Sequence, residues 1–576
     1  MRAMLKGIAA SDGIVCGQVY RLVEPDLTVK RHTITNLDDE LNRFHQALEA
    51  AVSDIETIKT RATKNLGADS AQVFSAHIVM LQDPELIAAV EKLIRQEHLN
   101  AEAALATVAQ RYEQSFKDLK GNAYMQERVT DLHDVIKRVT AQLLQVKLPD
   151  LALVNHPVIV VTHDLIPSDT VSVNPCYILG FVTDLGGRTS HSSILARSLN
   201  IPAVVGTQTA TADMPEGSTV VVNGNQGQVL LDPSEAELTT AREQMQARIA
   251  NQERLAKLQH TVTTSADGVG VTLAANIGTP QDIPNVLRNG AEAIGLMRTE
   301  FLYMDTDHLP SEDQQFAAYK EVLAAMAPHP VVMRTLDIGG DKPLPYLQQK
   351  PEANPFMGAR AIRRSLTHQE AFRSQLRALL RASAFGNLRI MFPMIATLDE
   401  FRQAKAIYDD ERSKLTVKQV PMGTVKVGMM VEVPAAALLA DRFAQEVDFM
   451  SIGTNDLIGY TMAADRTNQD VGYLYQPYHP AILRLVNRVI AAGHNAGIPV
   501  AMCGEMAGDP IAVPLLLGMG LDEFSMGAGS ILKTRELIAK LNAKDLQSLV
   551  ETALNSASTS QEVITMVQAA VPGLLK

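Results

Sequence analysis

The residues best placed to do chemistry begin with a histidine that follows two glycines. Residues 183–198 read TDLGGRTSHSSILARS, so Gly186 and Gly187 lead into a helical pattern that starts near His191. A helix N-terminus offers free N–H groups and the positive end of the helix dipole, which together suit a phosphate. A neutral imidazole there can be a nucleophile through its free ring nitrogen. A lone histidine at a helix start is more often structural, but this sequence context favours the nucleophile.

A second set of polar residues is spread through the C-terminal half. It comprises Arg298, Arg334, Arg360, Arg466, Glu432, Asn455, Asp456 and Cys503. Two cations 4 Å apart repel by about 4 kcal/mol at an effective dielectric of about 20, so we expect an anion to fill an arginine cluster. Arginine binds phosphate and carboxylate bidentately. Two carboxylates with a ligand phosphate are the usual Mg²⁺ site. The pattern indicates a small phosphate ester; the competing interpretation is that each arginine forms an ordinary salt bridge.

Eight strand-like segments that alternate with helices would position this second set. They lie at 271–277, 293–298, 331–337, 388–394, 427–433, 449–453, 500–503 and 523–526. Eight such repeats favour a (β/α)₈ barrel, whose catalytic groups come from the C-terminal ends of several strands. Arg298, Arg334, Glu432 and Cys503 lie at or near such ends, so the barrel would bring them to one rim.

The N-terminal half reads as an α/β unit interrupted by helices. Strand-like segments occupy the start of the chain and return from Pro157 onward. Between them, apolar residues from Leu37 to Ile58 recur four and three apart, which predicts one amphipathic helix. Four further helices are expected near 71–82, 84–98, 101–119 and 124–144. We therefore predict an α/β domain from 1–32 and 147–233, an inserted helical bundle at 33–146, a linker helix at 234–262 and a barrel at 263–576.

The composition excludes several classes of protein. The chain of 576 residues has a net charge of −12, which disfavours non-specific binding to nucleic acid because that needs a basic surface. Its three cysteines, Cys16, Cys176 and Cys503, are far apart and form no C-x-x-C pair, so we expect a reducing cytoplasm. We expect no signal peptide and no membrane insertion, because no apolar run reaches 18 residues.

Three motifs resemble those of the phosphoenolpyruvate (PEP)-utilising enzymes. They are GGRTSHSSILAR at 186–197, DIGGDK at 337–342 and DFMSIGTNDL at 448–457. The chain resembles, from end to end, the branch of that family that phosphorylates a small carrier protein for sugar uptake. The family's dikinases and synthases also carry a large nucleotide-binding domain, for which this chain has no room, and it has no G-x-x-x-x-G-K-[ST] loop.

The resemblance implies a role for each site residue. His191 would be the phosphohistidine nucleophile on a swivelling α/β domain, and Thr170 would hold its other ring nitrogen. Cys503 would protonate the leaving enolpyruvate to give pyruvate. Mg²⁺ would bind Glu432 and Asp456. PEP would be held by Arg298, Arg334, Arg360, Arg466, Asn455 and Lys342.

The resemblance also implies partners. The phosphoryl group would pass to a histidine of a small phosphocarrier protein that docks on the helical bundle, and the barrel would form a homodimer. The long helix after Ser234 would be the hinge on which the α/β domain swings. Two other functions stay open at this point: a dikinase-like enzyme that uses a nucleotide, and a regulator that keeps the fold without the activity.

Overall fold

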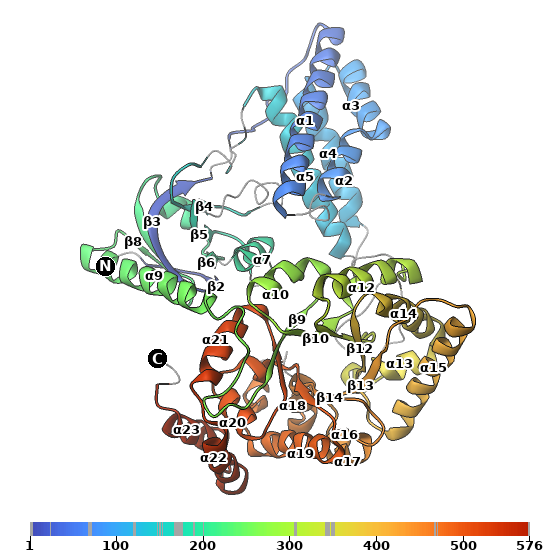
Figure 1. Ribbon diagram of the computed structural model, residues 1–576. Coiled ribbons are helices and arrows are strands. Elements are labelled where there is room, and N and C mark those ends of the chain that lie inside the picture. The colour runs from blue at the N-terminus through green and yellow to red at the C-terminus, as the bar shows by residue number, and fades with distance from the viewer. Residues whose placement is uncertain are drawn as a thin grey trace. The chain divides into compact units, whose positions relative to one another are not determined.

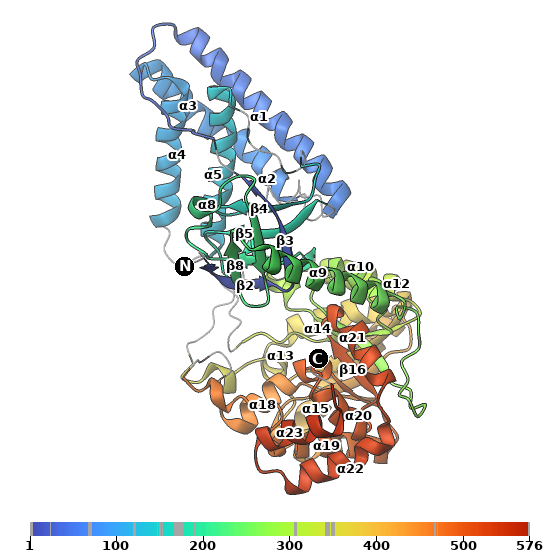
Figure 2. The same ribbon diagram turned by 90° about the vertical axis from the view of Figure 1, so that its left-hand side faces the viewer.

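The computed structural model divides into two compact units, Met1–Asn251 and Gln252–Lys576 (Figure 1, Figure 2). The structure describes residues 4–22, 25–66, 72–118, 123–146, 148, 151, 154–165, 177–187, 190–199, 201–304, 308–339, 346, 352–465, 468 and 470–573. The predicted site residues Thr170, Lys342 and Arg466 lie outside this set.

The second unit is built on a closed barrel of eight parallel strands, as the sequence predicts. Each observed strand overlaps the segment predicted for it. The strands are β9 (Thr272–Ile277), β10 (Ala293–Arg298), β11 (Pro330–Arg334), β12 (Asn387–Phe392), β13 (Lys426–Val431), β14 (Met450–Ile452), β15 (Val500–Met502) and β16 (Glu523–Met526). They are recognisable in the sequence because a strand buried on both faces is apolar along its length.

Helices surround the barrel and bury the outward-facing side chains of its strands. They are α10 (Ile283–Arg288), α11 (Phe301–Met304), α12 (Glu312–Met326), α13 (Ile362–Thr367), α14 (Gln369–Ala382), α15 (Leu398–Val417), α16 (Pro434–Leu438), α17 (Ala440–Phe443), α18 (Thr454–Met462), α19 (Pro480–Ala496), α20 (Ala512–Gly518), α21 (Ala528–Ala539), α22 (Ala543–Ser556) and α23 (Ser560–Ala570). A separate cluster that includes Leu296, Met391 and Phe449 fills the barrel interior, so the barrel is a packed core rather than a channel.

The first unit contains an eight-stranded sheet in the order β1-β8-β7-β3-β4-β5-β6-β2. Its strands are β1 (Met4–Lys6), β2 (Ile8–Ser11), β3 (Ile14–Arg21), β4 (Val158–Thr162), β5 (Ile178–Thr183), β6 (Ala203–Val205), β7 (Thr219–Asn223) and β8 (Gln228–Leu231). Side chains alternate between the faces of β4: Val158 and Val160 pack with α7 (His191–Ser198), and Ile159 and Val161 pack with α8 (Ala210–Asp213). The N-terminal β3 pairs with β4 across more than a hundred residues of chain.

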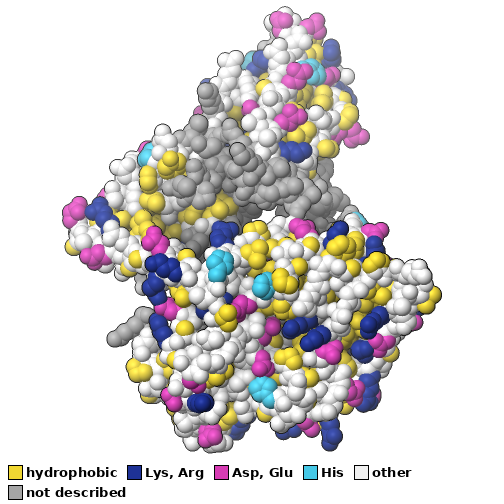
Figure 3. All heavy atoms as spheres, in the orientation of Figure 1, with side chains coloured by type: hydrophobic (Ala, Val, Ile, Leu, Met, Phe, Trp, Pro, Cys, Tyr) yellow, Lys and Arg dark blue, Asp and Glu magenta, His cyan; other side chains and the backbone are white. Residues whose placement is uncertain are grey.

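The intervening residues form a bundle of helices. These are α1 (Leu37–Leu66), α2 (Gln72–Leu81), α3 (Pro84–Glu97), α4 (Ala101–Asp118) and α5 (Ala123–Leu144). The apolar stripe of α1, including Leu41, Phe44 and Leu48, is buried among the other helices. On the face visible in Figure 3, acidic and basic side chains surround scattered hydrophobic ones. The stripe therefore serves packing within the chain.

The polar helix expected at 234–262 is α9 (Glu235–Ala256). It begins after Ser234, whose hydroxyl accepts a hydrogen bond from the Glu237 N–H at 3.4 Å, while the Glu237 carboxylate accepts one from the Ser234 N–H at 2.7 Å. This reciprocal pair is a capping box, which fixes where the helix starts. Among the described residues, no helix is long and apolar enough to cross a membrane.

Candidate active site

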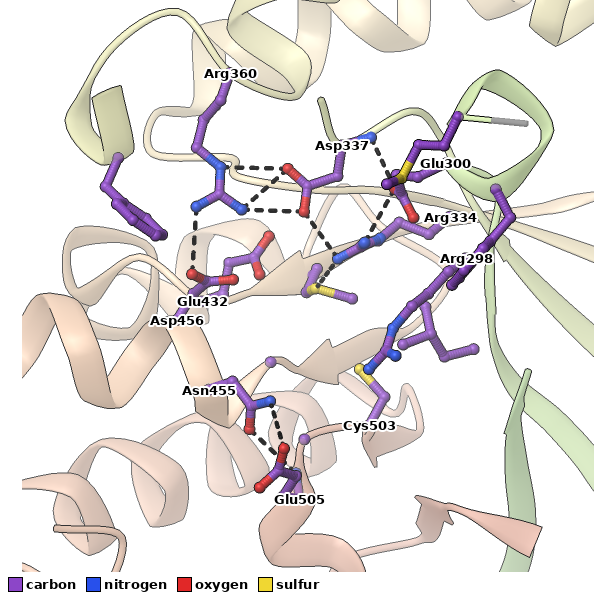
Figure 4. A pocket seen from close by; sticks show the side chains of 17 residues that line it. Arg298, Glu300, Arg334, Asp337, Arg360, Glu432, Asn455, Asp456, Cys503 and Glu505 are labelled. Carbon is purple, nitrogen blue, oxygen red and sulfur yellow. Dashed lines mark hydrogen bonds and ion pairs between the residues drawn. The ribbon is translucent and has the colours of Figure 1, made fainter. Parts of the chain in front are cut away.

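A cavity of about 530 Å³ opens where the barrel strands end (Figure 4). Seven of the predicted site residues line it: Arg298, Arg334, Arg360, Glu432, Asn455, Asp456 and Cys503. These residues span more than two hundred positions of sequence, and the barrel brings them together. The expectation that strand ends carry the site residues to one rim is therefore met by the geometry.

The barrel positions these residues because the carboxyl ends of parallel strands face the same rim. Arg298 is the last residue of β10 and Arg334 is the last residue of β11. Glu432 follows β13 and Cys503 follows β15, each by one residue. Asn455 and Asp456 lie in the first turn of α18, directly after β14.

The rim carries a chain of alternating arginines and carboxylates (Figure 4). Arg334 donates to Glu300 Oε1 at 3.0 Å and lies 3.1 Å from Asp337 Oδ2. Arg360 donates to both oxygens of Asp337, at 3.1 Å and 3.0 Å, and to Asp456 Oδ1 at 3.3 Å. Charge-assisted bonds of this kind are directional, so they fix the orientation of both guanidinium groups.

The neighbouring carboxylates keep Arg334 and Arg360 charged although both are buried. Burial alone would lower the pKa of the Arg334 guanidinium, but the Glu300 and Asp337 carboxylates raise it above its usual value. The pKa of Arg360 is raised in the same way, with Asp337 and Asp456 as the main carboxylates opposing its burial. Both arginines are thus permanent cations at the cavity wall.

Two of the arginines that line the cavity also form the salt bridges of the competing interpretation. Arg334 and Arg360 are neutralised by carboxylates of the chain itself, Glu300 and Asp337. The physical reason is desolvation: a buried cation needs a partner in the same structure before any ligand arrives. The side chain of Arg298 is exposed and points into the cavity near Cys503 (Figure 4).

Glu300 and Asp337 were not predicted as site residues. Glu300 lies two residues after Arg298, and Asp337 begins the DIGGDK motif. Both positions are just past the end of a strand, a signal that could have identified them, and Asp337 also begins a motif that is recognisable in the sequence. Glu300 Oε1 also accepts the Asp337 N–H at 2.9 Å, so it joins the loops that follow β10 and β11.

Glu432 and Asp456 form the acidic side of the cavity (Figure 4). Burial raises the pKa of Glu432 to about 8, and the Asp456 and Asp337 carboxylates add to the rise. One Glu432 oxygen accepts the Met394 N–H at 2.6 Å. Two carboxylates supply the hard oxygen donors that a divalent cation prefers, and a cation between them would favour the ionised form of Glu432. Among the described residues, no group of three or more His, Cys, Asp or Glu side chains could hold a metal, so ligand oxygens would have to complete the shell.

Cys503 presents a protonated thiol to the cavity. Burial raises the pKa of this thiol to about 11, and its Sγ lies 3.8 Å from the Ile452 carbonyl oxygen. The Cys503 carbonyl accepts a hydrogen bond from Asn276 Nδ2 at 3.0 Å, and Ser525 Oγ donates to Asn276 Oδ1 at 2.6 Å. A thiol held protonated and in place can serve as a general acid.

Asn455 links α18 to the loop after β15. Its Oδ1 accepts the Glu505 N–H at 3.2 Å, and its Nδ2 donates to Glu505 Oε1 at 3.4 Å. The amide is therefore held in one orientation at the edge of the cavity.

The predicted nucleophile belongs to the first unit, where α7 begins at His191 with Ser190 as its N-cap. The Gly187 carbonyl accepts hydrogen bonds from Ser190 Oγ at 2.8 Å and Ser193 Oγ at 2.7 Å, which fixes the glycine turn to the helix. Gly186 has φ +108°, a conformation that L side chains rarely adopt. The His191 side chain lies outside the described residues.

A barrel whose rim gathers arginines, paired carboxylates and a protonated thiol is typical of an enzyme that binds a small anionic substrate. Family models agree: those described as PEP-utilising enzyme, N-terminal, as its mobile domain and as its PEP-binding domain match residues 6–128, 154–227 and 252–543. The chain belongs to the PEP-utilising enzyme family, in the group of the phosphoenolpyruvate-protein phosphotransferases. This confirms the family that the three motifs predict, and the chain is accordingly a transferase.

Relatives in this group match almost the whole chain. The phosphoenolpyruvate-protein phosphotransferase of Latilactobacillus sakei is 54% identical over 98% of this chain and 98% of its own length. That of Bacillus subtilis (strain 168) is 54% identical over 98% of this chain and 99% of its own. A solution NMR structure of Enzyme I (nEIt) is 37% identical over 42% of this chain and 99% of its own, with a TM-score of 0.40.

Proposed function

We propose that the enzyme transfers the phosphoryl group of PEP to its own His191, releases pyruvate, and passes the phosphoryl group to a histidine of a small phosphocarrier protein. This is the first step of PEP-dependent sugar uptake and phosphorylation. One observation carries the proposal: the same cavity holds fixed cations and a protonated acid, Cys503. PEP needs both, because its phosphoryl and carboxylate groups are anionic and its leaving group must take up a proton to become pyruvate.

The cations of the site bind the anionic substrate in this proposal. Arg298 and Arg334 hold the transferring phosphoryl group, with Arg360 and Arg466 assisting. Asn455 orients the substrate, and Lys342 adds positive charge. Fixed positive charge around the equatorial oxygens is the main contribution that a protein makes to phosphoryl transfer.

Glu432 and Asp456 are the residues that would hold Mg²⁺ in this site. The fit rests on their chemistry: both supply hard carboxylate oxygens at one cavity wall, and the Asp456 carboxylate raises the pKa of Glu432. When bound, Mg²⁺ neutralises negative charge on the substrate oxygens.

The proposed reaction has two steps, transfer of the phosphoryl group to His191 and protonation of the leaving enolate. The free nitrogen of His191 attacks phosphorus in line, so an N–P bond forms as the P–O bond to the enol oxygen breaks and leaves its electron pair on oxygen. Cys503 then gives its proton to C3 of the enolate, which becomes the methyl group of pyruvate, and the Cys503 thiolate takes a proton back from water before the next turnover. Thr170 holds the second ring nitrogen of His191, which fixes the tautomer that attacks.

The remaining parts of the chain have roles in the same proposal. The helical bundle at 33–146 docks the phosphocarrier, and the α/β domain at 1–32 and 147–233 carries His191. This domain swings on the linker helix at 234–262 to the PEP site of the barrel at 263–576. The enzyme works in the cytoplasm as a homodimer joined through its barrels.

A single-turnover experiment tests the proposal. The pure protein is mixed with PEP and Mg²⁺, and pyruvate is measured enzymatically in the first seconds. We expect one pyruvate per active chain before a carrier protein is added, and no reaction when ATP replaces PEP. A chain that releases no pyruvate from PEP, or that is phosphorylated by ATP, contradicts the proposal.

A further inference from the structure

A buried glutamine lies behind the cavity and takes part in none of the steps above. Gln375 is on α14 and its side chain is 1% exposed. Its Oε1 accepts the Leu336 N–H at 3.0 Å, and its Nε2 donates to Thr299 Oγ1 at 3.1 Å and to Tyr319 Oη at 3.1 Å. Three of the four hydrogen bonds that an amide can make are therefore formed inside the protein.

The partners of Gln375 belong to the two loops that carry the ionic groups of the rim. Thr299 stands between Arg298 and Glu300, after β10, and Leu336 immediately precedes Asp337, after β11. Thr299 Oγ1 also donates to the Arg334 carbonyl at 2.9 Å. One amide thus joins the backbone of one loop, at Leu336, to the Thr299 side chain of the other, and each contact is next to a charged residue of the rim.

The relative position of the two loops determines which contacts Glu300 makes with Arg334 and Asp337. Glu300 Oε1 accepts from Arg334 at 3.0 Å and from the Asp337 N–H at 2.9 Å, so a single oxygen bonds to the end of β11 and to the loop beyond it. If the loops shift against each other, Glu300 loses one of these bonds and Arg334 changes its orientation. Displacements of about 1 Å at such groups can reduce a reaction rate a hundredfold.

We propose that Gln375 is a positioning residue for PEP-dependent phosphorylation, holding the loops after β10 and β11 in the register that aims Arg334 into the cavity. This inference rests on the function proposed above. Tyr319, which accepts a hydrogen bond from the Gln375 amide, is itself fixed by further hydrogen bonds. Its Oη donates to Gln315 Oε1 at 3.2 Å, and Gln315 Nε2 donates to the Pro310 carbonyl at 3.0 Å. The amide cannot rotate without breaking bonds in the loops and in α12.

The test compares Gln375→Met, which keeps the volume and loses the hydrogen bonds, with Leu379→Ala, which removes a buried apolar side chain from the same helix and so weakens the packing of α14. For each full-length variant, kcat and KM for PEP are measured beside the thermal unfolding midpoint. We expect Gln375→Met to lower kcat by about 10- to 100-fold with little change in KM. Leu379→Ala should lower the midpoint at least as far and keep kcat within about threefold.

A second pair of variants keeps the test informative if Gln375→Met folds poorly. Thr299→Val removes the hydroxyl that joins Gln375 to Arg334, and Thr299→Ser keeps it. We expect Thr299→Val to lower kcat as Gln375→Met does and Thr299→Ser to preserve it. Kinetic losses that only follow the lost stability, in all the variants alike, would overturn the inference. A wild-type chain that PEP does not phosphorylate would instead overturn the proposed function.

Discussion

Asp337 accepts Arg360 through both carboxylate oxygens, at 3.1 Å and 3.0 Å, and each of the two side chains is almost inaccessible to solvent. The same carboxylate lies 3.1 Å from Arg334. One anion therefore serves two buried cations. The cavity keeps its arginines charged and oriented before a substrate arrives, which is the preorganisation that phosphoryl transfer requires.

The first prediction removes this shared charge. Asp337→Asn keeps the shape of the side chain and leaves two buried guanidinium groups short of a carboxylate. Removal of one partner from a buried ion pair costs about 3–5 kcal/mol, so urea unfolding followed by circular dichroism should show a lower midpoint, and PEP turnover should fall. Asp399→Asn is the matched control, because Asp399 is exposed and lies 3.7 Å from Arg402. An unchanged midpoint for Asp337→Asn would show that Asp337 does not neutralise the arginines.

The second prediction concerns the protonation of Cys503. Burial raises its pKa to about 11, so the neutral thiol is the main form below that pH, and at pH 9 roughly 99% of it keeps its proton. Iodoacetamide reacts with thiolates, so at pH 8 Cys503 should be alkylated slowly in the folded chain and quickly in urea. Rapid alkylation of the folded chain at pH 8, located by peptide mapping, would contradict the raised pKa.

The same shift has consequences for stability and turnover. In the unfolded chain the thiol ionises near 8.5, so raising the pH from about 8.5 to 11 favours the unfolded state through this group.

Cys503→Ala removes the proposed acid and should slow pyruvate formation by about 10²- to 10⁴-fold. Pyruvate formation at the wild-type rate would exclude Cys503 as the proton donor.

The third prediction concerns metal. A chelator should stop PEP-dependent phosphorylation, and Mg²⁺ should restore it. Glu432→Gln and Asp456→Asn should each raise the Mg²⁺ concentration for half-maximal rate by about tenfold or more. Glu505→Gln is the matched control: this carboxylate lines the same cavity and pairs with Asn455. An equal shift in all three variants would mean that the effect is a general change in cavity charge.

The sequence predicts the barrel well because burial determines its strands. Runs such as 293–297 and 427–431 are apolar on both faces, and polar residues placed at their ends must reach one rim once the barrel closes. Arg298, Arg334, Glu432 and Cys503 follow from that argument alone. Helix ends are less accurate: the apolar stripe of α1 stops at Ile58, and the helix continues to Leu66 because good helix formers such as Lys59, Arg61 and Ala62 follow.

The pairing of charges could not be predicted in this way. Nothing in the spacing of Glu300, Arg334, Asp337 and Arg360 states which carboxylate meets which guanidinium, because side-chain contacts depend on loop geometry. The hydrogen bonds of Gln375 could not be predicted for the same reason: in the sequence it is one of many residues on the buried face of an amphipathic helix. Motif resemblance identifies the residues that touch the substrate and says little about those that hold them.

The most direct test of the account is the site of phosphorylation. Wild-type protein, His191→Ala and His163→Ala are each incubated with PEP and Mg²⁺, and intact mass is measured before and after brief acid treatment. His163 is the matched control, an exposed histidine of the same unit, in the loop after β4, that pairs with Asp184. We predict that wild type and His163→Ala each gain one acid-labile phosphoryl group and that His191→Ala gains none. A phosphoryl group on His191→Ala, or none on the wild type, would contradict the account.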